Sequence, residues 1–142
     1  MSSGGAGWEH FETDADVGVR AWAETRAEAF AQAALGVFAS IVTPDQVVER
    51  EHREVRAQAD SAERLLVAWI NECLYVHEIE GFVVHRVEVD AIQKTLVHGV
   101  LHGEGIDLGR HRPGTAVKAA TLDQVSVTET SGRHEVRVIV DV

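Results

Sequence analysis

The sequence has few of the features on which several classes of protein depend. It contains one cysteine, Cys73, so no disulfide forms within the chain, which argues against a secreted disulfide-stapled protein. No apolar run approaches the ~20 residues that a membrane-crossing helix needs. Residues 1–7 lack both the apolar stretch and the basic start of a signal peptide. We therefore expect a cytoplasmic protein with a flexible tail over residues 1–7 and one domain over residues 8–142.

Basic residues are also scarce. Lys and Arg total 13 against 23 Asp and Glu, Lys94 and Lys118 are the only lysines, and the net charge at pH 7 is −10. A domain that binds nucleic acid usually shows a basic patch that neutralises phosphates. This chain is acidic, so we do not expect direct nucleic-acid binding. An acidic surface attracts a metal ion or a basic protein partner, although the same acidity also serves solubility alone.

The motifs of several enzyme classes are missing as well. No glycine-rich loop lies between a predicted strand and a predicted helix, so nucleotide binding of the GxGxxG type is not indicated. One cysteine does not supply a zinc–thiolate cluster, and Cys73 falls on the apolar stripe of a predicted helix, which indicates a core residue. We interpret His98 and His102, on one face of a predicted strand, as structural or solvent-facing, and His77 as a hydrogen-bonded residue at the edge of the core.

Two amphipathic helices are predicted from apolar residues at helical spacing. Thr25 to Glu28 has the pattern of a capping box, and the apolar stripe behind it runs to Ile41, before Thr43-Pro44-Asp45. Residues 60–63 repeat the capping pattern, and the second stripe ends at Glu80-Gly81. The expected core residues on these stripes are Phe30, Phe38, Leu66, Trp69, Ile70 and Leu74.

The rest of the chain alternates between apolar and polar residues, which is typical of strands. We expect strands over residues 8–13, 17–24, 47–59, 83–90, 95–101, 117–122, 125–130 and 136–142. The alternation places His85 on the same face as Val83 and Val87, and Gly103, Gly105 and Gly109 indicate a looser segment after the strand ends at Leu101. Two helices followed by a run of strands predict a single α+β domain, in which the two amphipathic helices pack on one face of a mostly antiparallel sheet.

Two groups of oxygen-bearing residues are candidates for a metal site. Asp14 and Asp16 alternate in an extended segment, so both carboxylates would lie on one face. Asp141 and Val142 supply a carboxylate, backbone carbonyls and the terminal carboxylate close together. Calcium and magnesium take oxygens of these kinds, and the two groups converge if the first and last strands are neighbours. The alternative is that the aspartates form a turn or a cap and the C-terminus frays.

Several segments, taken in order, resemble the archease family over the chain after the tail. They are residues 12–20, similar to the family's His-Thr-Ala-Asp opening, residues 28–30 and 33–34, residues 65–75, similar to its second-helix signature, and residues 110–113, 117–121 and 138–142. Thr13 and Asp14 stand where the family usually has histidine and threonine. Ala116 replaces a common acidic residue, and Asp123 occupies a position that is often histidine.

The resemblance implies an α+β fold and a role as a non-catalytic activator of an RtcB-type RNA ligase in tRNA splicing and RNA repair. In that family the protein promotes metal-assisted guanylylation of the ligase's active-site histidine and supports multiple turnover. The resemblance also implies that Asp16, Asp141 and Val142 bind a divalent ion, with Asp14 as an additional candidate. Calcium is expected, with magnesium or manganese as alternatives. Lys118 matches a residue tied to activation, so Asp16, Lys118 and Asp141 are the expected activating residues.

Two other functions fit the same residues. A chaperone-like or scaffold module would have no metal role and would need an exposed apolar patch. A small metal-dependent hydrolase would use Asp14, Asp16 and Asp141 as ligands and His111 as base, and would need an open coordination position. No nucleophile with an adjacent base is visible in the sequence, so we predict a non-catalytic protein. If the metal site exists, Asp16 and Asp141 should lie within a few ångströms of each other on adjacent strands.

Overall fold

The computed structural model describes residues 5–13 and 16–142. These residues form strands, two α-helices and one short 3₁₀ helix. In chain order the elements are β1 (Gly7–Glu12), β2 (Val17–Ala23), α1 (Arg26–Ile41), η1 (Pro44–Gln46), β3 (Glu51–Gln58), α2 (Ala62–Glu80), β4 (Phe82–Ile92), β5 (Leu96–Gly105), β6 (Ala119–Thr130) and β7 (Arg133–Asp141).

Each α-helix begins at a cap that the sequence supplies. The hydroxyls of Thr25 before α1 and Ser61 before α2 each accept a hydrogen bond from an amide in the first turn. Such amides have no partner inside the helix, so the caps stabilise both starts. Gly81 ends α2 with a φ of 64°, a left-handed conformation that costs glycine little. The predicted helix boundaries are therefore confirmed.

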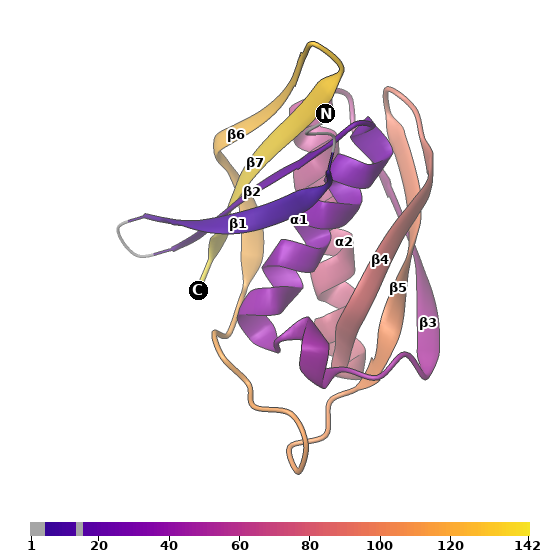
Figure 1. Cartoon of the computed structure of the whole chain (residues 1–142), viewed down its shortest axis with the longest axis vertical. Coiled ribbons are helices and arrows are strands. Elements are labelled where there is room, and N and C mark those ends of the chain that lie inside the picture. The colour runs from indigo at the N-terminus through magenta and orange to yellow at the C-terminus, as the bar shows by residue number, and fades with distance from the viewer. Residues whose placement is uncertain (1–4, 14–15) are drawn as a thin grey trace.

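The strands form two antiparallel sheets. Sheet A has the order β1-β2-β7-β6, and sheet B has the order β3-β5-β4. The two helices lie between the sheets (Figure 1): α1 contacts β2 and β4, and α2 contacts β6 and β3. The predicted α+β class and the antiparallel pairing are confirmed. The strands are divided between two sheets because α1 buries more than half of its residues, a wider apolar surface than one sheet covers.

A single hydrophobic core joins both helices to both sheets. All six predicted core residues are buried, and Trp69, the largest of them, donates its indole hydrogen to the carbonyl oxygen of Phe30 at 3.0 Å. Cys73 is fully buried beside them, as predicted. His77 bonds to the carbonyl oxygen of Phe82 at 2.9 Å, which confirms its place at the core edge. Within the described residues, no helix has the length and apolar character needed to cross a membrane.

Strand β4 departs from the predicted alternation. The register with β5 shifts between Val84 and Arg86, so Val83 and Val84 are both buried whereas His85 is exposed. The prediction that His85 shares the buried valine face is therefore wrong, because a bulge re-aims the side chains that follow it. The Nδ1 atom of His85 instead lies 2.9 Å from the carbonyl oxygen of Pro44 and holds η1 against β4.

The predicted end of the following strand at Leu101 is also wrong, since β5 continues to Gly105. Glycine is required inside this strand because a Cβ atom at Gly103 would lie 1.9 Å from the carbonyl oxygen of Val83. At the other end of the chain, the two strands predicted over 117–122 and 125–130 form one strand, β6, interrupted by a register shift.

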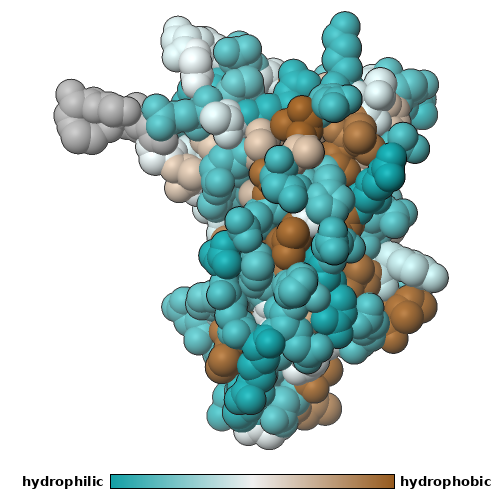
Figure 2. Space-filling view, turned by 90° about the vertical axis from the view of Figure 1, so that its right-hand side faces the viewer, coloured by the Kyte–Doolittle hydropathy of each residue, from teal (hydrophilic) through white to brown (hydrophobic). Residues whose placement is uncertain are grey.

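The outer face of sheet B is mainly hydrophilic (Figure 2). His98 lies on this face between two carboxylates, with Nδ1 2.6 Å from Asp90 and Nε2 3.1 Å from Glu54, and Asp90 above all raises the pKa of the imidazole. His102 pairs with Glu88 on the same face. Both histidines therefore pair with carboxylates on the outer face, which agrees with the interpretation of them as structural or solvent-facing.

Candidate functional site

One end of sheet A brings together the residues predicted for a metal site. The last pair between β2 and β7 is Val17 with Val140, so Asp16 and Asp141, the next residues outward, lie on adjacent strands at the same end. Lys118 reaches this end from the other side of β7, where its amide donates to the carbonyl oxygen of Asp141 at 2.8 Å. Three segments that are far apart in the sequence therefore meet there.

Alternation along the strands indicates which way the carboxylates face. Gly18 and Ile139 form a pair on the outer face of sheet A, away from the helices, and Asp16 and Asp141 each lie two residues further along. Asp141 is the last residue of β7, whereas Asp16 lies in a bend just before β2, next to the last pair of the ladder. The register agrees with the predicted placement, and the distance between the carboxylates stays a prediction.

Beside Asp16 lies a cleft of about 370 Å³ between the end of sheet A and α1. The Thr13 hydroxyl donates to the Asp16 carbonyl at 2.8 Å and accepts from the Asp16 amide at 3.0 Å, which fixes the backbone of Asp16. His10, Ser40 and Thr115 also line the cleft. They come from a strand, a helix and a connecting segment, so no local sequence signal joins them, and the sequence analysis missed all three.

Lys118 faces a different side of the same sheet end. Ala119 pairs with Asp141, so alternation places Lys118 on the face opposite to the Asp141 side chain. Lys118 is exposed and lines a second cavity, of about 340 Å³, together with Leu74 and His77 of α2. The register therefore places Asp141 and Lys118 on opposite faces of the sheet end, and Asp16 lines the cleft beside α1.

The predicted metal ligands among the described residues are few. Within residues 5–13 and 16–142, no group of three or more His, Cys, Asp or Glu side chains is arranged to hold one ion. Asp16 and Asp141 offer two carboxylates, and Val142 adds backbone and terminal oxygens, whereas calcium takes about six to eight oxygens. Asp14 lies outside the described residues. The donors fit a hard cation because all are oxygens, and water or a partner's groups would complete the shell.

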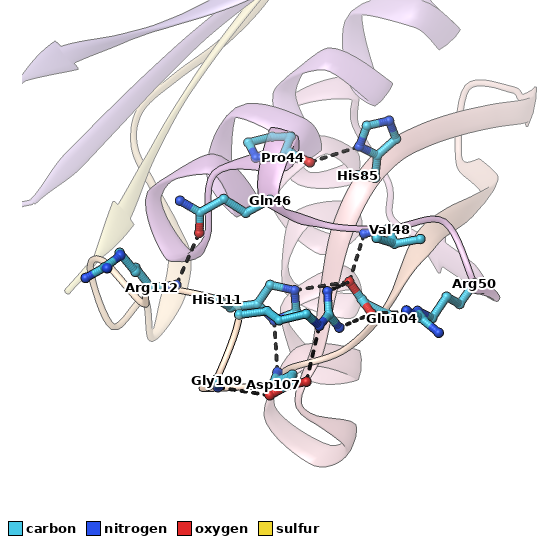
Figure 3. A network of polar contacts seen from close by, with 11 residues as sticks. Pro44, Gln46, Val48, Arg50, His85, Glu104, Asp107, Gly109, His111 and Arg112 are labelled. Carbon is cyan, nitrogen blue, oxygen red and sulfur yellow. Dashed lines mark hydrogen bonds and ion pairs between the residues drawn. The ribbon is translucent and has the colours of Figure 1, made fainter.

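A buried carboxylate fixes the segment that leads from sheet B to β6 (Figure 3). Glu104, at the end of β5, is 3% exposed and accepts from the Val48 amide at 2.8 Å and from Arg110 at 2.6 Å. His111 Nε2 and Arg50 Nε each lie 3.1 Å from its oxygens. Arg110 above all, with Val48 and His111, lowers the pKa of Glu104 to about 2, although burial acts in the opposite direction. Glu104 therefore stays ionised at neutral pH.

His111 is part of this network and does not reach solvent. Its Nδ1 atom accepts from the Asp107 amide at 2.9 Å, so the proton lies on Nε2, which donates to Glu104. The side chain is fully buried, and both nitrogens are occupied. The alternative in which His111 is the general base of a hydrolase is therefore contradicted.

The segment of residues 106–118 is also tied to the end of α1. The Gly114 amide donates to the carbonyl oxygen of Ile41, and the Thr115 amide donates to that of Ser40, both at 2.7 Å. Together with the Glu104 network, these bonds fix both halves of a connection that would otherwise be a long loop. The helix and the buried carboxylate thus set the position of the segment that delivers Lys118.

This geometry defines a class of protein: a small α+β domain with two helices between antiparallel sheets and one sheet end bearing carboxylates. The Archease protein family (MTH1598/TM1083) matches residues 8–142. Protein archease of Pyrococcus abyssi (strain GE5 / Orsay) is 34% identical over 140 residues, which cover 95% of this chain and 98% of the relative. Protein archease of Thermococcus gammatolerans is 38% identical over 124 residues, or 84% and 87% of the two chains.

One solved structure is also similar to this chain. The solution structure of Methanobacterium thermoautotrophicum protein 1598 is 30% identical to this chain and matches it with a TM-score of 0.78, over 96% of this chain and 99% of that one. The chain therefore belongs to the archease family, as the resemblance predicted.

Proposed function

We propose that this chain is a metal-binding activator of an RtcB-type RNA ligase. It would promote guanylylation of the ligase's active-site histidine and so support multiple turnover in tRNA splicing and RNA repair. It would act as a protein cofactor and catalyse no reaction itself. The partner is the ligase, and direct nucleic-acid binding is not expected.

The observation that carries the proposal is the meeting of Asp16, Asp141 and Lys118 at one end of sheet A, in a chain of the archease family. Transfer of a nucleotidyl group needs charge neutralisation around phosphate oxygens, which metal ions and positioned cations supply. Oxygen ligands and an exposed lysine at the same sheet end fit that need. Neither feature serves the hydrophobic core, so stability alone does not account for them.

The residues of this end would have separate roles. Asp16, Asp141 and Val142 would hold the ion, with Asp14 as an additional candidate, and calcium is the expected ion, with magnesium or manganese as alternatives. When bound, the ion supplies positive charge to triphosphate oxygens. Lys118 would add a second positive charge at the same sheet end. The hydroxyl of Thr13 bonds to the backbone of Asp16, and the segment of residues 106–118 holds Lys118, so the partner would meet a preorganised surface.

A multiple-turnover ligation assay with the ligase of the same organism tests the activator role. The parent protein should raise the number of turnovers, and Asp16→Asn, Asp141→Asn and Lys118→Gln should each lose most of the stimulation. Lys94→Gln changes the only other lysine and should stimulate as the parent does. Asp60→Asn changes an aspartate that is 85% exposed and serves as the matched acidic control. Full stimulation by a folded Asp16→Asn, Asp141→Asn double variant would refute the proposal.

The same preparations separate the two alternatives. A hydrolase would cleave a phosphoester or nucleotide without the ligase, and the Asp variants would not. A scaffold without a metal role would keep its activity in the Asp variants. It would instead depend on exposed apolar side chains, of which Tyr75 and Ile79 on α2 are 58% and 63% exposed. A Tyr75→Ser, Ile79→Ser variant that loses all stimulation, while the Asp variants keep it, would favour the scaffold.

Calorimetric titration with calcium, magnesium and manganese tests the metal part separately. The parent should bind calcium, and Asp16→Asn and Asp141→Asn should weaken binding because hard-cation sites depend on the charge of their ligands. The titration is repeated with the ligase present, since a partner's groups could complete the shell. Binding that is unchanged in both variants under both conditions would show that the ion, if bound, lies elsewhere.

A further inference from the structure

The outer face of sheet A carries a second polar feature, which the proposed metal site does not use. Its centre is Arg137 in β7. The register sets Arg137 opposite Arg20 of β2 and opposite Ser126 of β6. Like charges directly opposite each other on a sheet are destabilising, so each arginine needs a group that offsets its charge.

Arg20 has such groups. Its Nε and Nη2 atoms donate to the two carboxylate oxygens of Glu135 at 3.0 and 3.1 Å, and its Nη1 atom lies 3.1 Å from Glu9. The guanidinium also lies 4.8 Å from the ring centre of Trp22. With two carboxylates on one guanidinium, Arg20 has no charge left for a further anion.

Arg137 lacks such groups within the described residues. The ion pairs on this face join Arg20 and Arg133 to glutamates, and Arg137 takes part in none of them. Its Nε atom is buried with no hydrogen-bond partner, the one side-chain atom of this kind in the part of the chain that the structure describes. A buried polar atom without a partner is uncommon, and here it shows that no protein group among the described residues satisfies this guanidinium.

The guanidinium of Arg137 is already held in place. Its central carbon lies 4.5 Å from the ring centre of Phe11, which fixes it over the ring. Because Nε is buried, the two terminal nitrogens are the donors that a ligand reaches. A cation that is positioned and partly desolvated before binding loses little freedom when an anion arrives, so it binds that anion more strongly than a mobile surface arginine would.

We propose that Arg137 and Ser126 form a site for a single phosphate group on the outer face of sheet A. Ser126 lies directly opposite Arg137, with Cβ atoms expected about 4.5–5.5 Å apart, so its hydroxyl and the terminal guanidinium nitrogens face one ligand. These three donors match the three terminal oxygens of a phosphomonoester better than the two of a carboxylate. A long polyanion would need several free cations, whereas Arg20 is already paired.

The phosphate site is distinct from the proposed metal centre. Arg137 and Asp141 are four residues apart on one face of β7, about 13 Å at the rise of a strand. A phosphate at Arg137 therefore needs no metal ion. The inference stands without the ligase role, and it fails or holds in an experiment that contains neither metal nor ligase.

Nuclear magnetic resonance of the ¹⁵N-labelled chain tests the proposal, because the buried Nε–H of Arg137 should exchange slowly with water and give a visible signal. Inorganic phosphate, added without metal, should shift this signal and the Ser126 amide along one saturating curve. Arg137→Gln should weaken binding by about tenfold or more, the usual effect of losing a hydrogen bond to a charged group, and Ser126→Ala by a smaller factor. Arg56→Gln, which removes an exposed arginine of sheet B, should bind as the parent does.

Two further probes decide between ligand classes. A short polyglutamate peptide that binds more tightly than phosphate, and through Arg137, would overturn the phosphate assignment in favour of a protein carboxylate. An oligonucleotide without terminal phosphates that binds through Arg137 more tightly than phosphate would overturn the single-phosphate site in favour of a nucleic-acid strand. Equal weakening in Arg56→Gln, or an Arg137 signal that no anion shifts, would overturn the site. Arg137→Lys keeps the positive charge but lacks the paired donors of the guanidinium. It should recover part of the affinity that Arg137→Gln loses, which separates a loss of binding from misfolding.

Discussion

Replacing Glu104 by glutamine tests the idea that one buried carboxylate holds the connection between the two sheets. The change preserves the shape of the side chain but removes its charge, and the new amide group donates where the carboxylate accepted. At least one of the donors from Val48, Arg110, His111 and Arg50 then loses its acceptor. Breaking a buried ion pair from one side costs about 3–5 kcal/mol. We expect the low end, since Arg50 and Arg110 are 61% and 40% exposed and regain water.

The pKa of Glu104 gives a second, independent magnitude. A carboxyl group whose pKa falls from 4.5 to about 2 on folding contributes about 3 kcal/mol of stability, all of it present above pH 5. As the pH falls below the unfolded value toward the folded one, this contribution is lost, and about 2 kcal/mol of it is gone by pH 3. The stability difference between the parent and Glu104→Gln should therefore shrink on acidification.

Urea unfolding, followed by tryptophan fluorescence at pH 7 and pH 3, measures both effects. The difference between parent and Glu104→Gln should be about 3 kcal/mol at pH 7 and about 1 kcal/mol at pH 3. Glu24→Gln, at an exposed glutamate, should stay within about 0.5 kcal/mol of the parent at both values. A difference below about 1 kcal/mol at pH 7, or one that does not shrink at pH 3, would refute the account of Glu104.

Four further outcomes are expected. Trp69→Ala should lower the free energy of unfolding by roughly 3–5 kcal/mol, and an unfolding curve that overlays the parent's would show that the indole contributes nothing to the core. Gly103→Ala should cost more than about 2 kcal/mol in the same assay, because its Cβ would press on the carbonyl of Val83. Asp16→Asn should change stability by less than about 0.5 kcal/mol while calorimetry shows weaker metal binding. Arg137→Gln should melt no lower than the parent, since it removes a buried unpaired nitrogen and a charge on the residue opposite Arg20.

The helices and the core were predictable because their signals are local. The apolar stripe that contains Phe30 and Trp69 repeats every three to four residues, and the caps at Thr25 and Ser61 lie next to the turns they stabilise. The alternation of β2 and β7 was equally readable. Strand β4 was not, because whether His85 faces in or out depends on a bulge against β5.

The candidate site was predictable only in part, and the reason is physical. Asp16 and Asp141 were found as carboxylates at strand ends and through the family resemblance, and their meeting depends on β2 and β7 being neighbours. The cleft residues His10 and Thr115 come together only in three dimensions. The phosphate site at Arg137 was equally hidden, because nothing local in a strand marks an arginine whose partner is missing.

The two sheets differ in how soon a growing chain is able to complete them. Sheet B and α2 are drawn from one continuous stretch, residues 51–105, so their contacts close early during synthesis. Sheet A instead pairs residues 17–23 with residues 133–141, and β2 must wait for almost the whole chain. Such distant pairing is slow and leaves the edge of a strand open to wrong partners in the meantime. A chain halted before Arg133 would keep Asp16 but lose the strand that aligns it, so the carboxylate end forms as the final step of folding.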